Sequence, residues 1–130
     1  MEKFYDGLAL IAIRVRTFGS GTTPITGPEE PLQVLGVRRR KGAEVVAHRY
    51  VQRRRITNQL QKCLLVREGR AQVTLYGTDD TPFKRVVLKT GDIFILLRGG
   101  YRLKFLAETD MVEIKSGPYY NDRDKILLKP

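Results

Sequence analysis

The sequence predicts a single all-β domain, and three observations support that prediction. No stretch shows the apolar spacing of a long amphipathic helix. Short β-rich runs instead recur about every 8 to 12 residues, separated by Gly, Pro, Asp and Asn. A chain of 130 residues, 42% of them hydrophobic, can build one core and leaves little room for two. We therefore expect one β-sandwich or barrel that spans residues 1–130.

The expected strands follow one another with turn signals between them. Residues 8–16 are apolar first and alternating later, as in a half-buried strand. Residues 19–31 contain several Gly and Pro breakers and read as a loop, and Glu68-Gly69 reads as a tight turn. The polar tail, residues 117–130, ends in an apolar run. The remaining predicted strands cover residues 32–37, 44–51, 62–67, 71–76, 83–88, 92–97, 102–107 and 111–115.

The charge balance favours an anionic partner. The chain carries 24 Lys and Arg against 14 Asp and Glu, a net charge of +10, and the arginines cluster at residues 38–40 and 53–55. Such a field attracts phosphate-bearing molecules, although it can also serve solubility alone. Nucleic-acid binding by charge is an alternative, but the chain has no Trp, no zinc-finger spacing and no helix-turn-helix pattern. We therefore expect a small anionic ligand rather than nucleic acid.

The sequence gives no sign of a membrane segment or an oxidising compartment. No apolar run approaches the ~20 residues that span a bilayer. The first residues lack the basic-then-apolar order of a signal peptide. Cys63 is the single cysteine, so no internal disulfide is possible. We expect a cytoplasmic protein.

Two segments carry a family resemblance. The first is residues 41–50, Lys-Gly-Ala-Glu-Val-Val-Ala-His-Arg-Tyr, followed by residues 63–69, Cys-Leu-Leu-Val-Arg-Glu-Gly. The second is residues 89–101, which begin Lys-Thr-Gly-Asp, run through an apolar strand and end at Gly-Gly-Tyr. Together they resemble the two motifs of the cupins. The resemblance implies a double-stranded β-helix, or jelly-roll barrel, over about residues 32–116, and a homodimer through the N-terminal strand.

The C-terminal part narrows the resemblance. The run Glu-Ile-Lys-Ser-Gly-Pro-Tyr at residues 113–119, followed by Asp124-Lys125, is similar to the end of a small bacterial cupin subgroup. Members of that subgroup accompany enzymes of surface-polysaccharide and nucleotide-sugar biosynthesis. More distantly, the layout is similar to metal-free nucleotide-sugar ketoisomerases, which use histidine as the base. The resemblance thus implies a protein that binds or isomerises an anionic sugar nucleotide.

The metal ligands that the cupin motifs would supply are largely replaced. His48 stands at the first histidine position, but the second is Tyr50 and the last is Tyr101. The acidic position falls on Lys62, with Gln61 beside it. A cation at a ligand position opposes metal binding, and His48 is the only histidine in the chain. We therefore expect neither a metal nor another cofactor.

The residues that remain at these positions form the predicted site. His48 and Tyr50 are two apart on a predicted strand, so their side chains point to one face. His48 would be the base, Tyr50 or Tyr101 its partner, and Lys62 a ligand contact near both. The alternative is that His48 has no catalytic role and that the barrel is non-catalytic and serves binding or assembly.

The arginines complete the predicted site. Arg53 and Arg55 lie after the first motif and could clamp a phosphate, because the guanidinium fork matches its oxygens. A solvated basic face is the alternative. Arg39 alternates with its neighbours on a predicted strand and is a further candidate ligand contact, with Glu44 or Glu113 as possible partners for the arginines of that run.

Overall fold

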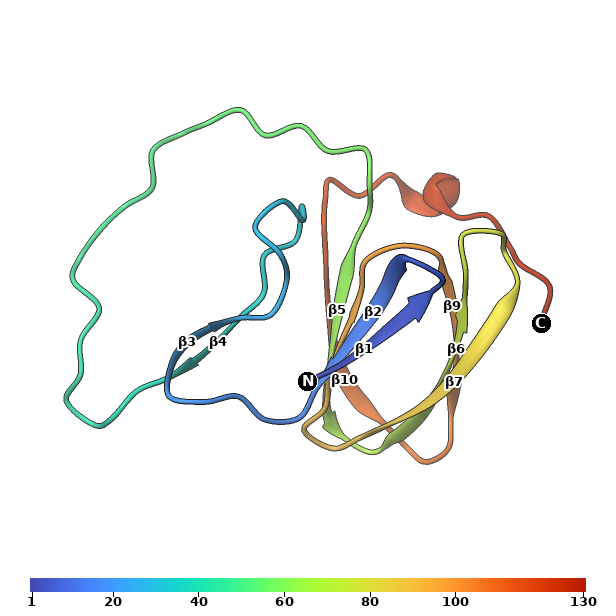
Figure 1. The fold of residues 1–130 in the computed structure, drawn as a ribbon, viewed down its shortest axis with the longest axis horizontal. Helices are drawn as coiled ribbons and strands as arrows, with labels where there is room; N and C mark the ends of the chain where they lie inside the picture. The colour runs from blue at the N-terminus through green and yellow to red at the C-terminus, as the bar shows by residue number, and fades with distance from the viewer.

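The computed structural model describes residues 1–130, apart from the side chain of Asp122, and it is built almost entirely of β-strands (Figure 1). A five-stranded sheet faces a three-stranded sheet, and a separate two-stranded ribbon lies to one side. The elements are β1 (Glu2–Asp6), β2 (Ala9–Val15), β3 (Gly21–Pro24), β4 (Leu35–Arg38), β5 (Lys62–Glu68), β6 (Arg70–Tyr76), β7 (Pro82–Lys89), β8 (Ile93–Leu96), β9 (Gly100–Phe105), β10 (Asp110–Lys115) and the 3-10 helix η1 (Asn121–Asp124).

All strand pairs are antiparallel, which confirms the all-β prediction. The larger sheet has the order β1-β2-β8-β5-β10, and the smaller has the order β7-β6-β9. The two sheets do not close into a barrel, because β10 and β9 are each paired on one side only within the described structure. Among the described residues, no helix is long and apolar enough to cross a membrane.

Both faces of the five-stranded sheet are covered at its central strands. Its inner face packs against the three-stranded sheet around Phe94, Leu64 and Leu75, all of which are buried. Its outer face packs Ile13 and Ile95 against the chain between β2 and β4. Burial on both faces explains why the β2 and β8 segments read as continuous apolar runs rather than clean alternations.

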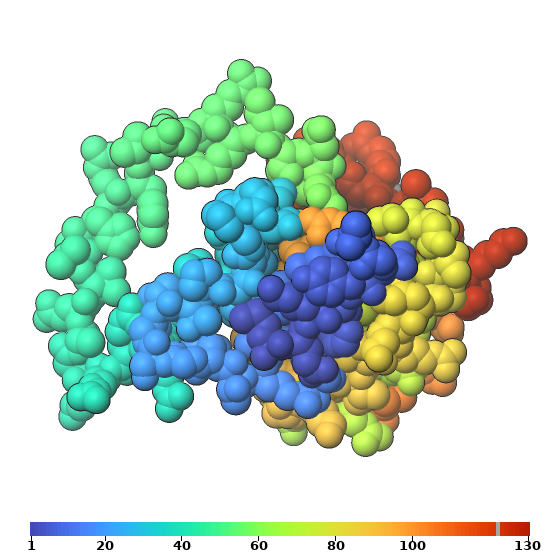
Figure 2. Space-filling view, in the orientation of Figure 1, coloured from blue at the N-terminus to red at the C-terminus, as the bar shows by residue number. Residues whose placement is uncertain are grey.

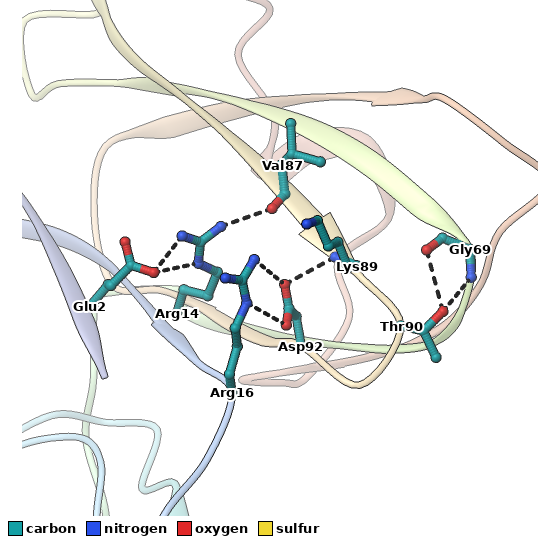
Figure 3. Close-up of polar contacts among 8 residues, drawn as sticks. All are labelled: Glu2, Arg14, Arg16, Gly69, Val87, Lys89, Thr90 and Asp92. Atoms are coloured by element: carbon teal, nitrogen blue, oxygen red, sulfur yellow. Dashed lines mark hydrogen bonds and ion pairs between the residues drawn. The ribbon is translucent and has the colours of Figure 1, made fainter.

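Polar contacts tie the strands together at one corner of the sandwich (Figure 3). Arg14 donates to Glu2 and, over 2.8 Å, to the carbonyl of Val87, which links β1 and β2 to β7. Asp92, which is buried, accepts from Arg16 at 3.0 Å and from the Lys89 amide at 2.9 Å. The Gly-Asp pair of the second motif therefore closes the turn between β7 and β8.

One predicted strand is absent. Residues 44–51 have strand-like alternation, but the structure assigns them no strand, and the prediction is wrong for this segment. They lie within the arm, which we define as residues 39–60, every one of them exposed. The arm arches away from the sheets and from the β3–β4 ribbon (Figure 2). A strand needs a neighbouring edge for its backbone hydrogen bonds, and here the segment has none.

The N-terminal prediction is correct in part. The strand predicted at residues 8–16 exists as β2. It is an inner strand of the sheet, paired with β1 on one side and β8 on the other. The edge on this side of the sheet is therefore β1, which the sequence did not reveal as a strand. β3 also forms inside the segment expected to be a loop, where it pairs with β4.

Candidate ligand-binding pocket

Lys62 and Tyr101 meet at one end of the sandwich. Lys62 begins β5, on the same face of the strand as the core residues Leu64 and Val66, so its side chain points between the sheets. Its ammonium donates to the Tyr101 hydroxyl over 2.6 Å and to a carboxylate oxygen of Glu113 over 2.7 Å. The same nitrogen lies 4.7 Å from the centre of the Tyr101 ring, within cation–π range.

The ammonium and its carboxylate partner stay charged around neutral pH. Burial of Lys62 disfavours its charged form, but the hydrogen bonds that it donates to Glu113 and Tyr101 outweigh this and raise the pKa of Lys62. The hydrogen bond from Lys62 lowers the pKa of Glu113, against the opposing effect of burial. Lys62 is therefore a fixed cation at the sandwich end, and it cannot accept a proton at neutral pH.

A cavity of about 490 Å³ opens beside this pair. Its walls come from β5, β6, β8, β9, β10, the C-terminal tail and Leu60 at the end of the arm, with Leu96 and Leu103 as apolar lining. The tail packs closely on β9, since a Cβ placed on Gly100 would lie 2.7 Å from Leu128 Cδ1. The cavity is large enough for a small organic molecule.

The charged and aromatic lining of this pocket is cationic on balance. Among the described side chains, Lys62, Lys115 and Lys125 line it together with the carboxylate of Asp124. Glu113 lies beside the lining, 2.7 Å from Lys62 and 3.8 Å from Lys115. The Lys115 ammonium lies 5.1 Å from the centre of the Tyr119 ring. A lysine ammonium has three donors, and two of those of Lys62 bond to Tyr101 and Glu113. One strong donor therefore remains for an anionic or hydroxyl group.

The structure does not bring His48 and Tyr50 to this pocket. Both lie in the exposed arm and are absent from the residues that line the cavity. They do contact one another: the His48 and Tyr50 rings are 5.3 Å apart in an edge-on arrangement, and His48 Nε2 is 3.4 Å from the Tyr50 hydroxyl. Of the two partners predicted for His48, Tyr50 is the one it contacts, whereas Tyr101 contacts Lys62.

The predicted arginine contacts also lie apart from the pocket. Arg53 and Arg55 are exposed in the arm, where Arg55 donates to the Arg53 carbonyl. Arg39 donates to Thr22 Oγ1 over 2.7 Å, rather than to Glu44 or Glu113. These three arginines thus lie on the arm and its junction with the β3–β4 ribbon. Lys62 is the one predicted ligand contact that lines the pocket.

The motif positions do not fit a transition metal. Among the described side chains, no three of His, Cys, Asp and Glu lie close enough to hold an ion. Lys62 occupies the place of an acidic ligand and is paired with Glu113, so its positive charge would face any bound cation.

Sequence reasoning missed a buried polar cluster next to the pocket. Gln61, fully buried, donates to Glu30 over 2.6 Å and accepts from the Leu32 amide over 2.9 Å. Glu30 also accepts from Arg98 over 2.7 Å. The cluster fastens residues 30–32 to the end of β5. The sequence could have indicated it through Gln61, a polar residue at the start of an apolar strand.

Comparison with known proteins adds no assignment. The chain matches no family model, no curated protein and no solved structure.

Proposed function

We propose that this chain binds a small anionic sugar derivative, of the nucleotide-sugar class, in the pocket formed by Lys62 and Tyr101. The observation that carries the proposal is the Lys62 ammonium, held as a cation by Glu113 and Tyr101 beside a cavity of about 490 Å³. A phosphate oxygen is a suitable acceptor for its remaining donor. The resemblance to cupins of polysaccharide biosynthesis supports the same ligand class.

The lining favours a ligand with both charge and a flat or polyhydroxylated part. Lys115 and Lys125 supply positive charge at the pocket, and the Tyr101 and Tyr119 rings offer surfaces for a sugar or a base. Leu96 and Leu103 provide apolar contact at the same site. Few polar groups within a largely apolar cavity are typical of small-molecule sites.

Binding is better supported than isomerisation. Proton transfer next to a sugar carbonyl needs a base whose pKa is near neutrality and which reaches the ligand. The raised pKa of Lys62 excludes it from that role at neutral pH. His48 has the right chemistry, but an isomerase would require the arm to carry it to the pocket. The proposal therefore stands first as binding, with catalysis dependent on that movement.

Thermal melting against a ligand panel tests the proposal. The panel contains a nucleoside diphosphate sugar, the nucleoside diphosphate, a sugar phosphate and the neutral sugar. A ligand at 100 times its dissociation constant adds about 2.7 kcal/mol, or several degrees in Tm. We expect shifts with the anionic sugar compounds and none with the neutral sugar. No shift with any anionic compound would contradict the proposal.

A further inference from the structure

The open side of the sandwich presents two strand edges without neighbours. β9 has β6 on one side only, and β10 has β5 on one side only, among the described residues. Residues 106–109 form the turn that joins β9 to β10, and hydrogen bonds hold this turn against Arg70 at the start of β6. The Leu106 amide donates to the Arg70 carbonyl over 2.9 Å, and Thr109 contacts Arg70 as well. The two edges therefore lie on the same side of the molecule. Free edges of this kind are templates for further pairing.

Apolar side chains are exposed along these two strands. Phe105 on β9 is 56% exposed, and Ile114 on β10 is 52% exposed. Val112 on β10 and Leu65 on the neighbouring β5 are also exposed. Phe105 shares its face of β9 with Tyr101 and Leu103, which pack against the core, whereas Val112, Ile114 and Leu65 lie on the outer face of the five-stranded sheet. Phe105, beside the unpaired β9 edge, is therefore the exposed apolar side chain that an added strand could cover.

The arm carries a matching segment that is itself without a neighbour. Residues 44–51 are rich in β-branched and aromatic side chains, of which Val46 is 79% and Tyr50 81% exposed. Val45 and Val51 are exposed to a similar degree. Both faces of the extended segment thus offer apolar side chains. The arm stands away from the body that carries the open edges (Figure 2), which leaves it accessible to another molecule.

We propose that two copies of the chain exchange arms, so that residues 44–51 of each copy add as an edge strand to β9 of the other. The added strand would lie about 4.8 Å from β9. The arrangement is self-complementary, since each copy offers one arm and one edge, and it closes as a two-fold dimer. Each added strand would bury its backbone and one of its two faces, which carry either Val45 and Val51 or Val46 and Tyr50. Two such strands, with the edges they cover, approach the roughly 1,600 Å² of a stable interface.

Charge distinguishes this dimer from binding of a polyanion by the arm. The arm holds seven basic residues against one acidic residue, and each whole copy carries +10. Repulsion between two such copies is screened by salt, so the dimer should strengthen as salt rises. Binding of a nucleic acid to the arginines would weaken with salt. The apolar side chains interleaved with the arginines favour the dimer.

The first test measures molar mass by sedimentation at low and high NaCl concentration. We expect wild-type dimers that strengthen with salt. Ala47→Pro removes a backbone donor in the middle of the segment and should weaken the dimer by roughly 10-fold or more. Asn58→Pro, equally exposed in the same arm but outside the segment, is the matched control and should leave the dimer intact. A monomer at every salt concentration, or a dimer indifferent to Ala47→Pro, would overturn the proposal.

A mixing experiment separates exchange between copies from pairing within one copy. Phe105→Lys places a charge on the β9 edge and should also prevent the dimer. A mixture of the Ala47→Pro and Phe105→Lys chains retains one intact arm and one intact edge on different molecules. We expect the mixture to recover dimers that neither variant forms alone. Failure to recover them, or association seen only with an added oligonucleotide and lost with salt, would overturn the exchange.

Discussion

At the scale of single residues, the Lys62–Glu113 pair defines the character of the pocket. The side chain of Lys62 is 11% exposed, so its charge depends on the carboxylate beside it, whereas that of Glu113 is 39% exposed and partly screened by water. We predict that Glu113→Gln destabilises the fold by about 1 kcal/mol at neutral pH, because a buried cation loses its counter-charge. Chemical denaturation measures this loss. Glu68→Gln, an exposed carboxylate on the same strand as Lys62, is the control and should have little effect.

The sign of the pH dependence follows from the two pKa shifts. The lowered pKa of Glu113 means that the pair stabilises the fold above about pH 4.5, and that this stabilisation is lost as pH falls through the lowered value. The raised pKa of Lys62 means that the stabilisation is present below about pH 10.5 and is lost above the raised value. The difference between wild type and Glu113→Gln should therefore be flat between these limits and shrink in acid. A difference that persists at low pH would contradict the pairing.

Gly99, directly before β9, is fixed by its surroundings. It has φ +73°, and a Cβ there would lie 2.3 Å from the Tyr76 carbonyl oxygen. We predict that Gly99→Ala destabilises the fold by more than about 1 kcal/mol, from strain and collision together. Gly91→Ala is the matched comparison, since Gly91 has φ +89° but open space around it. Equal losses of stability for the two variants would show that the Tyr76 contact has no consequence.

At the scale of elements, Gln61 joins the loop before β4 to the start of β5. Its amide serves three partners: Glu30, the Leu32 amide and the Leu97 carbonyl. We predict that Gln61→Leu costs roughly 2 kcal/mol or more, because the backbone groups would be left buried and unpaired. The measurement is denaturant unfolding, with the exposed Gln59→Leu as control. If both variants lose the same stability, the cluster does not hold the loop.

The elements also show where sequence reasoning works and where it stops. From residue 62 onward, every predicted strand exists, because tight turns such as Glu68-Gly69 fix which runs can pair. Residues 44–51 carry the same local alternation and form no strand, because pairing depends on an edge supplied from elsewhere. β1 and β3 were missed for the converse reason. Their own residues do not indicate strands, and they form because β2 and β4 provide edges with which they pair.

The pocket was predictable in part for similar reasons. Motif spacing singled out Lys62 and Tyr101, and the structure places them in contact. The same spacing placed His48 and Tyr50 at the site, but that placement depended on a strand which is absent. Glu113 was considered a partner for arginine and is instead the partner of Lys62, a pairing that depends on the β5–β10 register. Sequence motifs therefore identified residues at the site better than they identified contacts between elements.

At the scale of the whole molecule, positive charge is distributed over two places with different surroundings. The arm holds much of the net charge on exposed arginines, whereas the pocket holds lysines among aromatic and apolar side chains. A long basic arm attracts anions without selecting among them. Under the proposed function the pocket can select, because a ligand would have to fit a cavity of about 490 Å³ and reach the Lys62 ammonium. Selective binding should therefore depend on Lys62 and not on net charge.

Calorimetric titration of a nucleoside diphosphate sugar into wild type, Lys62→Met and Lys104→Met tests that claim most directly. Both variants lose one positive charge, but Lys62 lines the pocket and Lys104, on the exposed face of β9, does not. We predict that Lys62→Met weakens binding by roughly 10-fold or more, the effect of one charge-assisted hydrogen bond, and that Lys104→Met binds as wild type does. Equal affinity in all three proteins would contradict the account and assign the binding to charge outside the pocket.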